Sequence, residues 1–185
     1  MLANELVPKQ KLPGVLDNII SGKLSRIDLS AYCYLVSGMM KSGVSARRHL
    51  VQTICSSFEK MVYNGATSLW ETIDGFNAFG GGGSLCHAWS SVTPYFCAHC
   101  ILGVTPLEPG FKKFEVKPYP AGLHKAKGSV PTPYGFITVS WQLCENGMSV
   151  KVEHPVELEC ITSSYEECGS VKFEISCGAV SFCAQ

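Results

Sequence analysis

The strongest constraint on this chain is a change of hydrophobic period between about Gly103 and Gly110. Before this point, apolar residues recur at steps of three and four residues, which is the spacing of one helix face. After it, apolar and polar residues alternate in short runs, as in half-buried strands. We therefore predict an α+β chain in which helices come first and a small antiparallel β-sandwich follows, with the division at 1–108 and 109–185.

The first part is expected to contain four helices. A short apolar face follows Pro13-Gly14, and a second helix is predicted from Ser30 to Met40. Ser45 is the expected N-cap of a third helix. The apolar stripe of that helix comprises Leu50, Val51, Ile54, Phe58, Met61 and Val62. Its opposite face, which we expect to be solvated, carries Arg47, Arg48, Glu59 and Lys60.

The fourth predicted helix is apolar on almost every side. It is expected to begin at the N-cap Ser84, to run to about Leu102 and to be kinked by Pro94, which lacks a backbone donor. A helix of this kind must be enclosed by neighbours. Because three or four such helices cannot cover one another, we expect them to be a segment of a larger helical array.

The second part is predicted to hold five or six strands. Turn signals separate them at Pro118, Pro120-Ala121-Gly122, Asn146-Gly147 and Gly169. The step from Glu145 to Met148 predicts a hairpin between a strand ending near Leu143 and one starting near Ser149.

Composition excludes several classes of function. Lys plus Arg and Asp plus Glu both number 15, so there is no net positive charge to attract nucleic acid or anionic lipid. No run approaches the roughly 18 apolar residues of a membrane span, and the first residues lack the pattern of a signal peptide. A soluble chain is expected, and its compartment, cytoplasmic or exported, stays open.

The ten cysteines are expected to be mainly reduced and buried, because several fall on apolar faces. A sharper alternative is a zinc site, since Cys97 and Cys100 have C-x-x-C spacing. Its ligands would come from Cys86, His87, Cys97, His99 and Cys100. All five fall in one helical pattern, which is unfavourable for a structural zinc site, so we expect no metal. No sequence feature indicates an organic cofactor, and none is expected.

The segment that most clearly suggests a catalytic or binding site joins the last two predicted helices. Glu71 directly follows Trp70 in a non-helical stretch, which would hold a carboxylate beside an aromatic surface on which a sugar ring can stack. Alternatively, Glu71 caps a helix or pairs with an arginine. His87 is expected in the first turn of the fourth helix, where the helix dipole favours the neutral imidazole; it is otherwise a satisfied core histidine. The glycines from Gly80 to Gly83 lack the phosphate-binding pattern and suggest a flexible lip.

Several motifs in fixed order resemble the C-terminal end of bacterial α-L-rhamnosidases. They are GATSLWETIDG, SLCHAWSSVTPYF, ILGVTPLEPGFKKFEVKPYP and AKGSVPTPYGFITVSWQ, and the likeness is strongest from Asn64 to Gln142. The resemblance implies the end of a six-fold double-helical, (α/α)6 barrel followed by a β-sandwich. It also implies hydrolysis of terminal α-L-rhamnose from glycosides with inversion at the anomeric carbon.

The resemblance also implies roles for single residues. Glu71 matches the general base, and His87 matches a histidine that contacts the sugar. Trp70 would lie at the sugar pocket or form a wall of the barrel, and Asp74 would support the loop. The loop between Glu71 and His87 is shorter and richer in glycine than is common in the family, so the pocket rim differs here.

The second catalytic carboxylate, the general acid, has no candidate among these residues. Inversion needs a second carboxyl group roughly 6.5–9.5 Å from the first, and Asp74 is too close to Glu71 in sequence to serve. The resemblance places the general acid upstream, in missing N-terminal domains of the same enzyme. The alternatives are another helical-barrel glycosidase or phosphorylase, and a carbohydrate-binding or structural module without catalysis.

Overall fold

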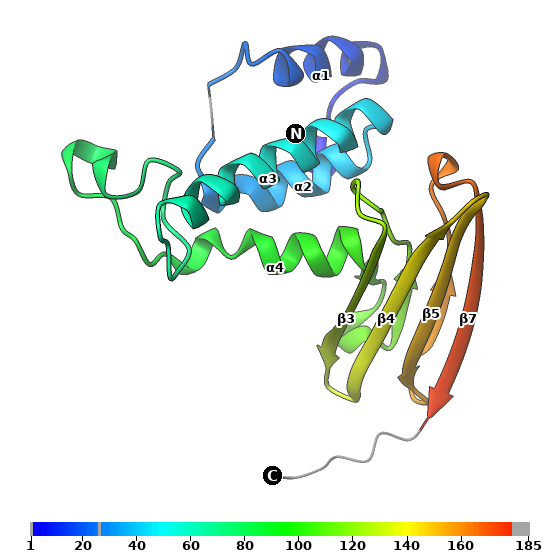
Figure 1. The fold of residues 1–185 in the computed structure, drawn as a ribbon. Coiled ribbons are helices and arrows are strands. Elements are labelled where there is room, and N and C mark those ends of the chain that lie inside the picture. Colours follow the sequence, from blue (N-terminus) through cyan, green and yellow to red (C-terminus); the bar gives the residue numbers. More distant parts are fainter. Residues whose placement is uncertain (1, 26, 179–185) are drawn as a thin grey trace. The chain divides into compact units, whose positions relative to one another are not determined.

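The computed structural model describes residues 2–25 and 27–178 (Figure 1). It divides into two compact units, Met1–Phe96 and Cys97–Gln185. All four α-helices belong to the first unit and all seven strands of the described residues to the second. The prediction of an α+β chain with helices before strands is therefore confirmed.

The first unit contains helices α1 (Leu12–Ile20), α2 (Tyr32–Met40), α3 (Val44–Tyr63) and α4 (Val92–Phe96). Helix α2 packs against α3 and α4. The side chains that fill this core are fully or nearly fully buried and include Val36, Met39, Leu50, Ile54 and Met61. Three of these lie on the predicted stripe of α3, but Val62 of the same stripe is 72% exposed.

The N-terminal end of α3 differs from the prediction in two respects. The N-cap is Gly43, with φ of +94°, and Ser45 lies inside the helix without a capping hydrogen bond. Arg47, predicted to be solvated, is buried, and its Nη1 donates to the carbonyl of Met40 at 3.0 Å. Met40 is the last residue of α2, where carbonyls have no partner within the helix. The arginine is therefore buried because it satisfies the end of the preceding helix.

The fourth helix is much shorter than predicted. Ser84 to His87 are not helical, Ala88–Ser90 is a single 3₁₀ turn, and α4 begins only at Val92. After Phe96 the chain forms a π-helical turn, Cys97–Ile101, closed by a bond from the Leu102 amide to the Cys97 carbonyl at 2.8 Å. Pro94 is the third residue of α4, where an amide donor has no helical partner in any case. The predicted kink at Pro94 is therefore wrong, because the proline stands at a helix start.

The second unit is built from two sheets. Strands β1 (Val104–Pro106), β2 (Lys113–Val116) and β6 (Glu159–Thr162) form one in the order β1-β2-β6. Strands β3 (Lys125–Thr132), β4 (Gly135–Cys144), β5 (Gly147–Pro155) and β7 (Ser170–Gly178) form the other in the order β3-β4-β5-β7. The pairing is mainly antiparallel, as predicted, but β2–β6 and β5–β7 are parallel. These parallel pairs arise because the chain leaves β5, adds β6 to the first sheet and returns as β7.

The hairpin between β4 and β5 is present, one residue away from its expected register. Cys144 pairs with Gly147, so the two-residue loop is Glu145-Asn146. Gly147 has φ of +152°, and a Cβ on it would lie 1.8 Å from the carbonyl oxygen of Ser170 in β7. The glycine is needed inside β5 because β7 lies so close to it, and not as a turn residue.

The apolar faces of the two sheets contribute to one core. Phe114 of β2 meets His154 of β5 edge-on, with ring centroids 5.4 Å apart. Trp141 of β4 is 3% exposed, and its Nε1 donates to the carbonyl of Ile101 at 2.7 Å. That bond satisfies a carbonyl at the end of the π-helical turn and fixes the turn to the four-stranded sheet.

We expect Trp141→Phe to lower the free energy of unfolding by about 1–3 kcal/mol, because the buried Ile101 carbonyl loses its donor. Urea denaturation of the chain measures this loss. Trp89→Phe is the matched control, since Trp89 is 78% exposed, and it should change stability by less than about 0.5 kcal/mol. Equal losses in both variants would contradict the role assigned to the Trp141 bond.

Candidate functional site

Two loop segments of the first unit run side by side at the predicted site. The amide of His87 donates to the carbonyl of Leu69 at 2.8 Å, and the amide of Glu71 donates to the carbonyl of Ser84 at 2.9 Å. The Ser68 hydroxyl also donates to the carbonyl of Leu85. These backbone contacts bring the segment that carries Glu71 next to the segment that carries His87, although 16 positions separate the two residues in the sequence.

The Glu71 carboxylate is held at one oxygen. Its Oε2 accepts a hydrogen bond from the Ser84 amide at 3.2 Å, and the side chain is half-buried. Among the described residues, no other hydrogen bond or ion pair involves this carboxylate. The alternatives in which Glu71 pairs with an arginine or caps a helix therefore find no support in the described residues. A carboxylate held at one oxygen keeps the other for a water molecule or a sugar hydroxyl.

His87 has extended backbone geometry, with φ of −130° and ψ of 106°, directly before the Ala88–Ser90 turn. The prediction that it lies in the first turn of an α-helix is therefore wrong. Its ring meets that of Trp89 edge-on, with centroids 6.2 Å apart and an angle of 84°. Because Trp89 is 78% exposed, the two rings form an aromatic pair open to solvent.

Trp70, which directly precedes Glu71, is buried. It is 9% exposed, and a Cβ on Gly75 would lie 2.8 Å from its ring, so the ring packs directly on that glycine. Trp70 and Leu85 line a cavity of about 500 Å³, whose other lining residues include neither Glu71 nor His87.

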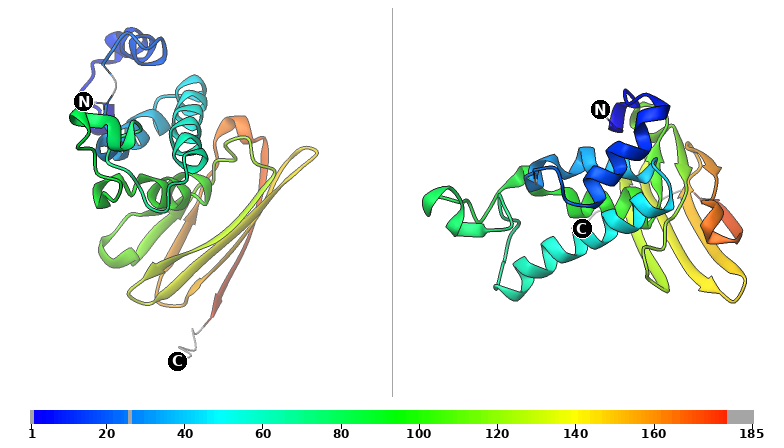
Figure 2. Two further views of the ribbon diagram at one scale, coloured as in Figure 1. Left: turned by 60° about the vertical axis from the view of Figure 1, so that its left-hand side comes forward. Right: turned by 90° about the horizontal axis from the view of Figure 1, so that it is seen from above.

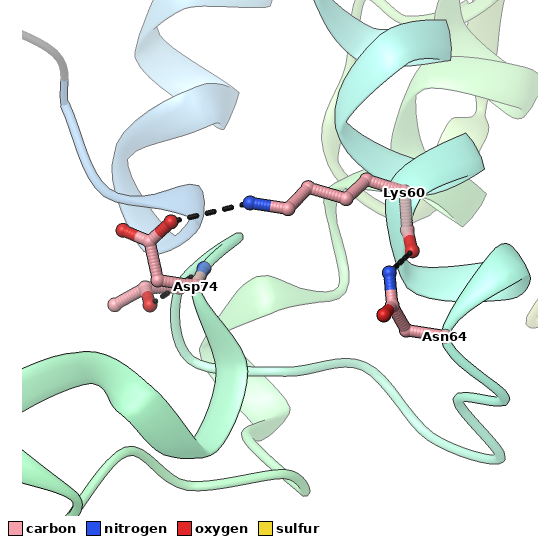
Figure 3. A network of polar contacts seen from close by, with 4 residues as sticks. Lys60, Asn64 and Asp74 are labelled. Atoms are coloured by element: carbon pink, nitrogen blue, oxygen red, sulfur yellow. Dashed lines mark hydrogen bonds and ion pairs between the residues drawn. The ribbon is translucent and has the colours of Figure 1, made fainter.

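Asp74 ties this cavity to helix α3. Its Oδ1 lies 3.3 Å from the Lys60 ammonium, and its amide donates to the Thr72 hydroxyl at 3.2 Å (Figure 3). Next to this pair, the side-chain amide of Asn64 donates to the Lys60 carbonyl at 2.7 Å at the end of α3 (Figure 3). Both charged side chains are nearly half exposed, so the ion pair adds little to stability, typically less than about 1 kcal/mol. The pair joins the surface of this loop to α3.

The glycine-rich loop is packed more tightly than the sequence suggests. Gly83 is buried, and a Cβ on it would lie 1.9 Å from the carbonyl oxygen of Gly75. Gly75, Gly80 and Gly81 have positive φ, a region that favours glycine. The prediction of a flexible lip is therefore wrong for Gly83, because this residue forms the close contact that brings Ser84 against Glu71.

The cysteines do not form the alternative zinc site. In residues 2–25 and 27–178, no three His, Cys, Asp or Glu side chains are grouped so that they could hold a metal ion. Burial raises the pKa of the Cys100 thiol far above its usual range, and the neighbouring Cys97 raises it further, so Cys100 is a poor source of thiolate. The nine described cysteines are not in disulfides, and of these only Cys100 and Cys168 are buried. The expectation of mainly buried thiols is therefore wrong.

Sequence reasoning missed two parts of this arrangement. Ser84 was expected to be a helix cap, but its amide and carbonyl bond Glu71 instead. Trp89 was expected to be enclosed in a helix, but its ring lies open beside His87. The signal for both was available in the Gly80–Gly83 run, since four glycines delay the start of a helix.

Comparison with known proteins gives this geometry a context. Residues 103–163 match the family model of the bacterial alpha-L-rhamnosidase C-terminal domain. An α-L-rhamnosidase of Alteromonas sp. (strain LOR) is 32% identical over 176 residues, which cover 85% of this chain and 18% of the relative. The chain belongs to the bacterial α-L-rhamnosidase family. An α-L-rhamnosidase of Formosa agariphila is 28% identical over 116 residues, covering 57% of this chain and 12% of the relative.

Solved rhamnosidase structures share the fold. The GH78 family rhamnosidase of Bacillus sp. GL1 aligns with a TM-score of 0.75 and 23% identity, over 93% of this chain and 19% of the Bacillus chain. The α-L-rhamnosidase of Dictyoglumus thermophilum aligns with a TM-score of 0.59 and 24% identity, over 87% of this chain and 19% of that protein. The chain thus spans less than a fifth of the length of these relatives. In its described part, none of the helices has the length and apolarity of a membrane crossing.

Proposed function

We propose that this chain supplies the base-bearing part of an α-L-rhamnosidase that removes terminal α-L-rhamnose from glycosides with inversion. Residues 1–108 would be the last part of an (α/α)6 barrel, and residues 109–185 a C-terminal β-sandwich domain. The observation that carries the proposal is the Glu71 carboxylate, held at one oxygen by the Ser84 amide in a rhamnosidase-family chain. The matching motifs assign it the role of general base.

In this mechanism Glu71 accepts a proton from a water molecule as the water oxygen attacks the anomeric carbon. The new carbon–oxygen bond forms on one face of the sugar while the glycosidic bond breaks on the other. The leaving oxygen takes a proton from a general acid, which we assign to another part of the longer enzyme. Separation of the two carboxyl groups by roughly 6.5–9.5 Å leaves room for the water.

His87 and Trp70 complete the proposed site with different roles. His87 is assigned to a sugar hydroxyl, since an imidazole both donates and accepts hydrogen bonds and this one lies on the segment bonded to that of Glu71. Trp70 is assigned to the wall of the sugar pocket, because Gly75 covers its ring and it lines the adjoining cavity.

We expect the 185-residue chain alone to show no measurable turnover of 4-nitrophenyl α-L-rhamnoside. Inversion needs two carboxyl groups, and a base without its acid does not activate the leaving group. Release of 4-nitrophenol by purified chain, compared with buffer and with Glu71→Gln, tests this expectation. Release that Glu71→Gln abolishes would contradict it, because the acid would then lie within these residues.

A further inference from the structure

The outer face of the four-stranded sheet carries an ordered set of lysines, far from Glu71 in the sequence. In one row across the strands, Lys125 pairs with Gln142, Gln142 with Ser149, and Ser149 with Lys172. The sheet runs from β3 in yellow-green to β7 in red (Figures 1 and 2). This row therefore crosses all four strands and has an ammonium group at each end.

The next row, two residues further along, also carries two lysines but ends in a glutamate. Lys127 pairs with Ser140, and Ser140 with Lys151. Lys151 in turn pairs with Glu174, and its ammonium lies 3.2 Å from that carboxylate. Side chains two residues apart on a strand point to the same face, so both rows project from one side of the sheet.

The two rows border a depression in this face. A hollow of about 730 Å³ is lined by Lys125, Lys127 and Lys151, together with Ser140, Gln142 and Ser149. A second hollow of about 510 Å³ shares Ser149 and Cys144 with the first and extends the surface to Lys172. The combined depression presents ammonium, hydroxyl and amide groups, together with the carboxylate of Glu145 at its hairpin end.

The charge of this face is local. Among the described residues, Lys125, Lys127 and Lys172 have no carboxylate within ion-pair distance. The chain as a whole has no net charge, so this concentration of lysine is not a consequence of a basic composition. Lys125 and Lys127 lie two residues apart on β3, and Lys172 lies three strands away on β7, so an extended ligand with several acidic groups could reach all three ammonium groups.

We propose that this face binds an acidic oligosaccharide, one whose sugars carry carboxylate or sulfate groups. The lysines at both ends of the first row would pair with two acidic groups of the ligand through charge-assisted hydrogen bonds. The hydroxyl and amide side chains between them, on Gln142 and Ser149, match sugar hydroxyls in kind. The site would hold an acidic glycan to the second unit of the chain.

Nucleic acid suits this face less well. Proteins that bind single strands place aromatic rings under the bases. The aromatic residue among those lining the first hollow is Trp141, which is 3% exposed and turned into the core. The second hollow is lined by no aromatic residue. The two hollows therefore offer charge and hydrogen bonds without an exposed aromatic ring.

Affinity electrophoresis of the full chain tests the proposal, with polygalacturonate, dextran sulfate or neutral dextran in the gel. We expect retardation by one or both acidic polysaccharides and none by dextran, and the two acidic arms distinguish carboxylate from sulfate recognition. The variant K125Q/K127Q/K172Q should bind about tenfold or more weakly. The control K9Q/K11Q/K112Q removes the same charge from exposed lysines elsewhere and should bind within about twofold of the original chain.

Three results would overturn the proposal. They are no retardation by either acidic polysaccharide, equal weakening in the two triple variants, and binding of duplex DNA at least as tight as that of the acidic polysaccharides. Circular dichroism of both variants shows whether the fold is retained. The variant K125R/K127R/K172R keeps the charges and should keep binding, so a loss caused by misfolding is distinguished from a loss of charge.

Discussion

Glu71→Gln should lower the turnover of the longer rhamnosidase to which we assign this chain by about a hundred- to ten-thousandfold, the usual contribution of general acid–base catalysis. Glutamine has nearly the shape of glutamate, and its side-chain oxygen can still accept from the Ser84 amide at the position of Oε2. It cannot take a proton from water. Initial rates on 4-nitrophenyl α-L-rhamnoside at saturating substrate measure the effect.

Asp74→Asn is the matched control for this substitution. Asp74 is also an acidic residue of the same loop, but its carboxylate pairs with Lys60 on an exposed surface. Loss of such a pair costs less than about 1 kcal/mol of stability and should leave turnover within about threefold. An Asp74→Asn enzyme as impaired as Glu71→Gln would show that the charge of the loop matters and not a base at position 71.

Azide adds a second, independent readout. An azide ion attacks the anomeric carbon without giving up a proton, so it does not need a general base. Added azide should therefore restore sugar release in Glu71→Gln, with a glycosyl azide of inverted configuration as product. An unrestored variant whose circular dichroism is unchanged would point to a role for Glu71 other than base.

Elements with a long, regular pattern were predictable from the sequence. Helices α2 and α3, the end of β4 and the start of β5 appear near their expected bounds, because the apolar residues of these elements repeat over at least two periods. The turn that separates β3 from β4 was not predicted. Strand β1 was missed because it has only three residues and ends at Pro106. The return of β7 beside β5 could not be predicted, since parallel pairing depends on where β6 takes the chain.

The errors at the site have a common physical origin. From Ser84 to Leu102 the sequence is apolar enough to suggest one helix, yet Ser84 to His87 bond the Glu71 segment instead of forming a helical turn. A local pattern does not show which backbone partner wins such a competition. Arg47 is a similar case, because its burial depends on a carbonyl at the end of the preceding helix. The motifs identified the residues that we propose for catalysis and sugar binding. They did not predict the backbone contacts around those residues.

Gly83→Ala should damage the proposed site as strongly as any substitution outside Glu71. The new Cβ would lie 1.9 Å from the Gly75 carbonyl oxygen and 3.0 Å from the Cβ of Ala78, so the backbone must move. Gly75 is itself fixed under the ring of Trp70, so the displacement is expected to separate the Ser84 amide from Glu71. We expect a loss of about 1–3 kcal/mol in stability, as for other overpacked sites. Turnover of the longer enzyme should fall at least about tenfold, the equivalent of 1.4 kcal/mol in barrier.

The neighbouring Gly82→Ala provides the control at almost the same place in the chain. Its φ is not positive, and the nearest atom to the new Cβ would be the Phe79 carbonyl oxygen at 3.8 Å, an ordinary contact. Such a substitution is neutral or stabilises by up to about 1 kcal/mol, because alanine restricts the unfolded chain. In thermal unfolding and turnover assays, Gly83→Ala should therefore lower both stability and turnover, whereas Gly82→Ala should lower neither. If the two variants behave alike, the Gly80–Gly83 loop is flexible, and the packing of Gly83 on Gly75 does not hold Glu71 in place.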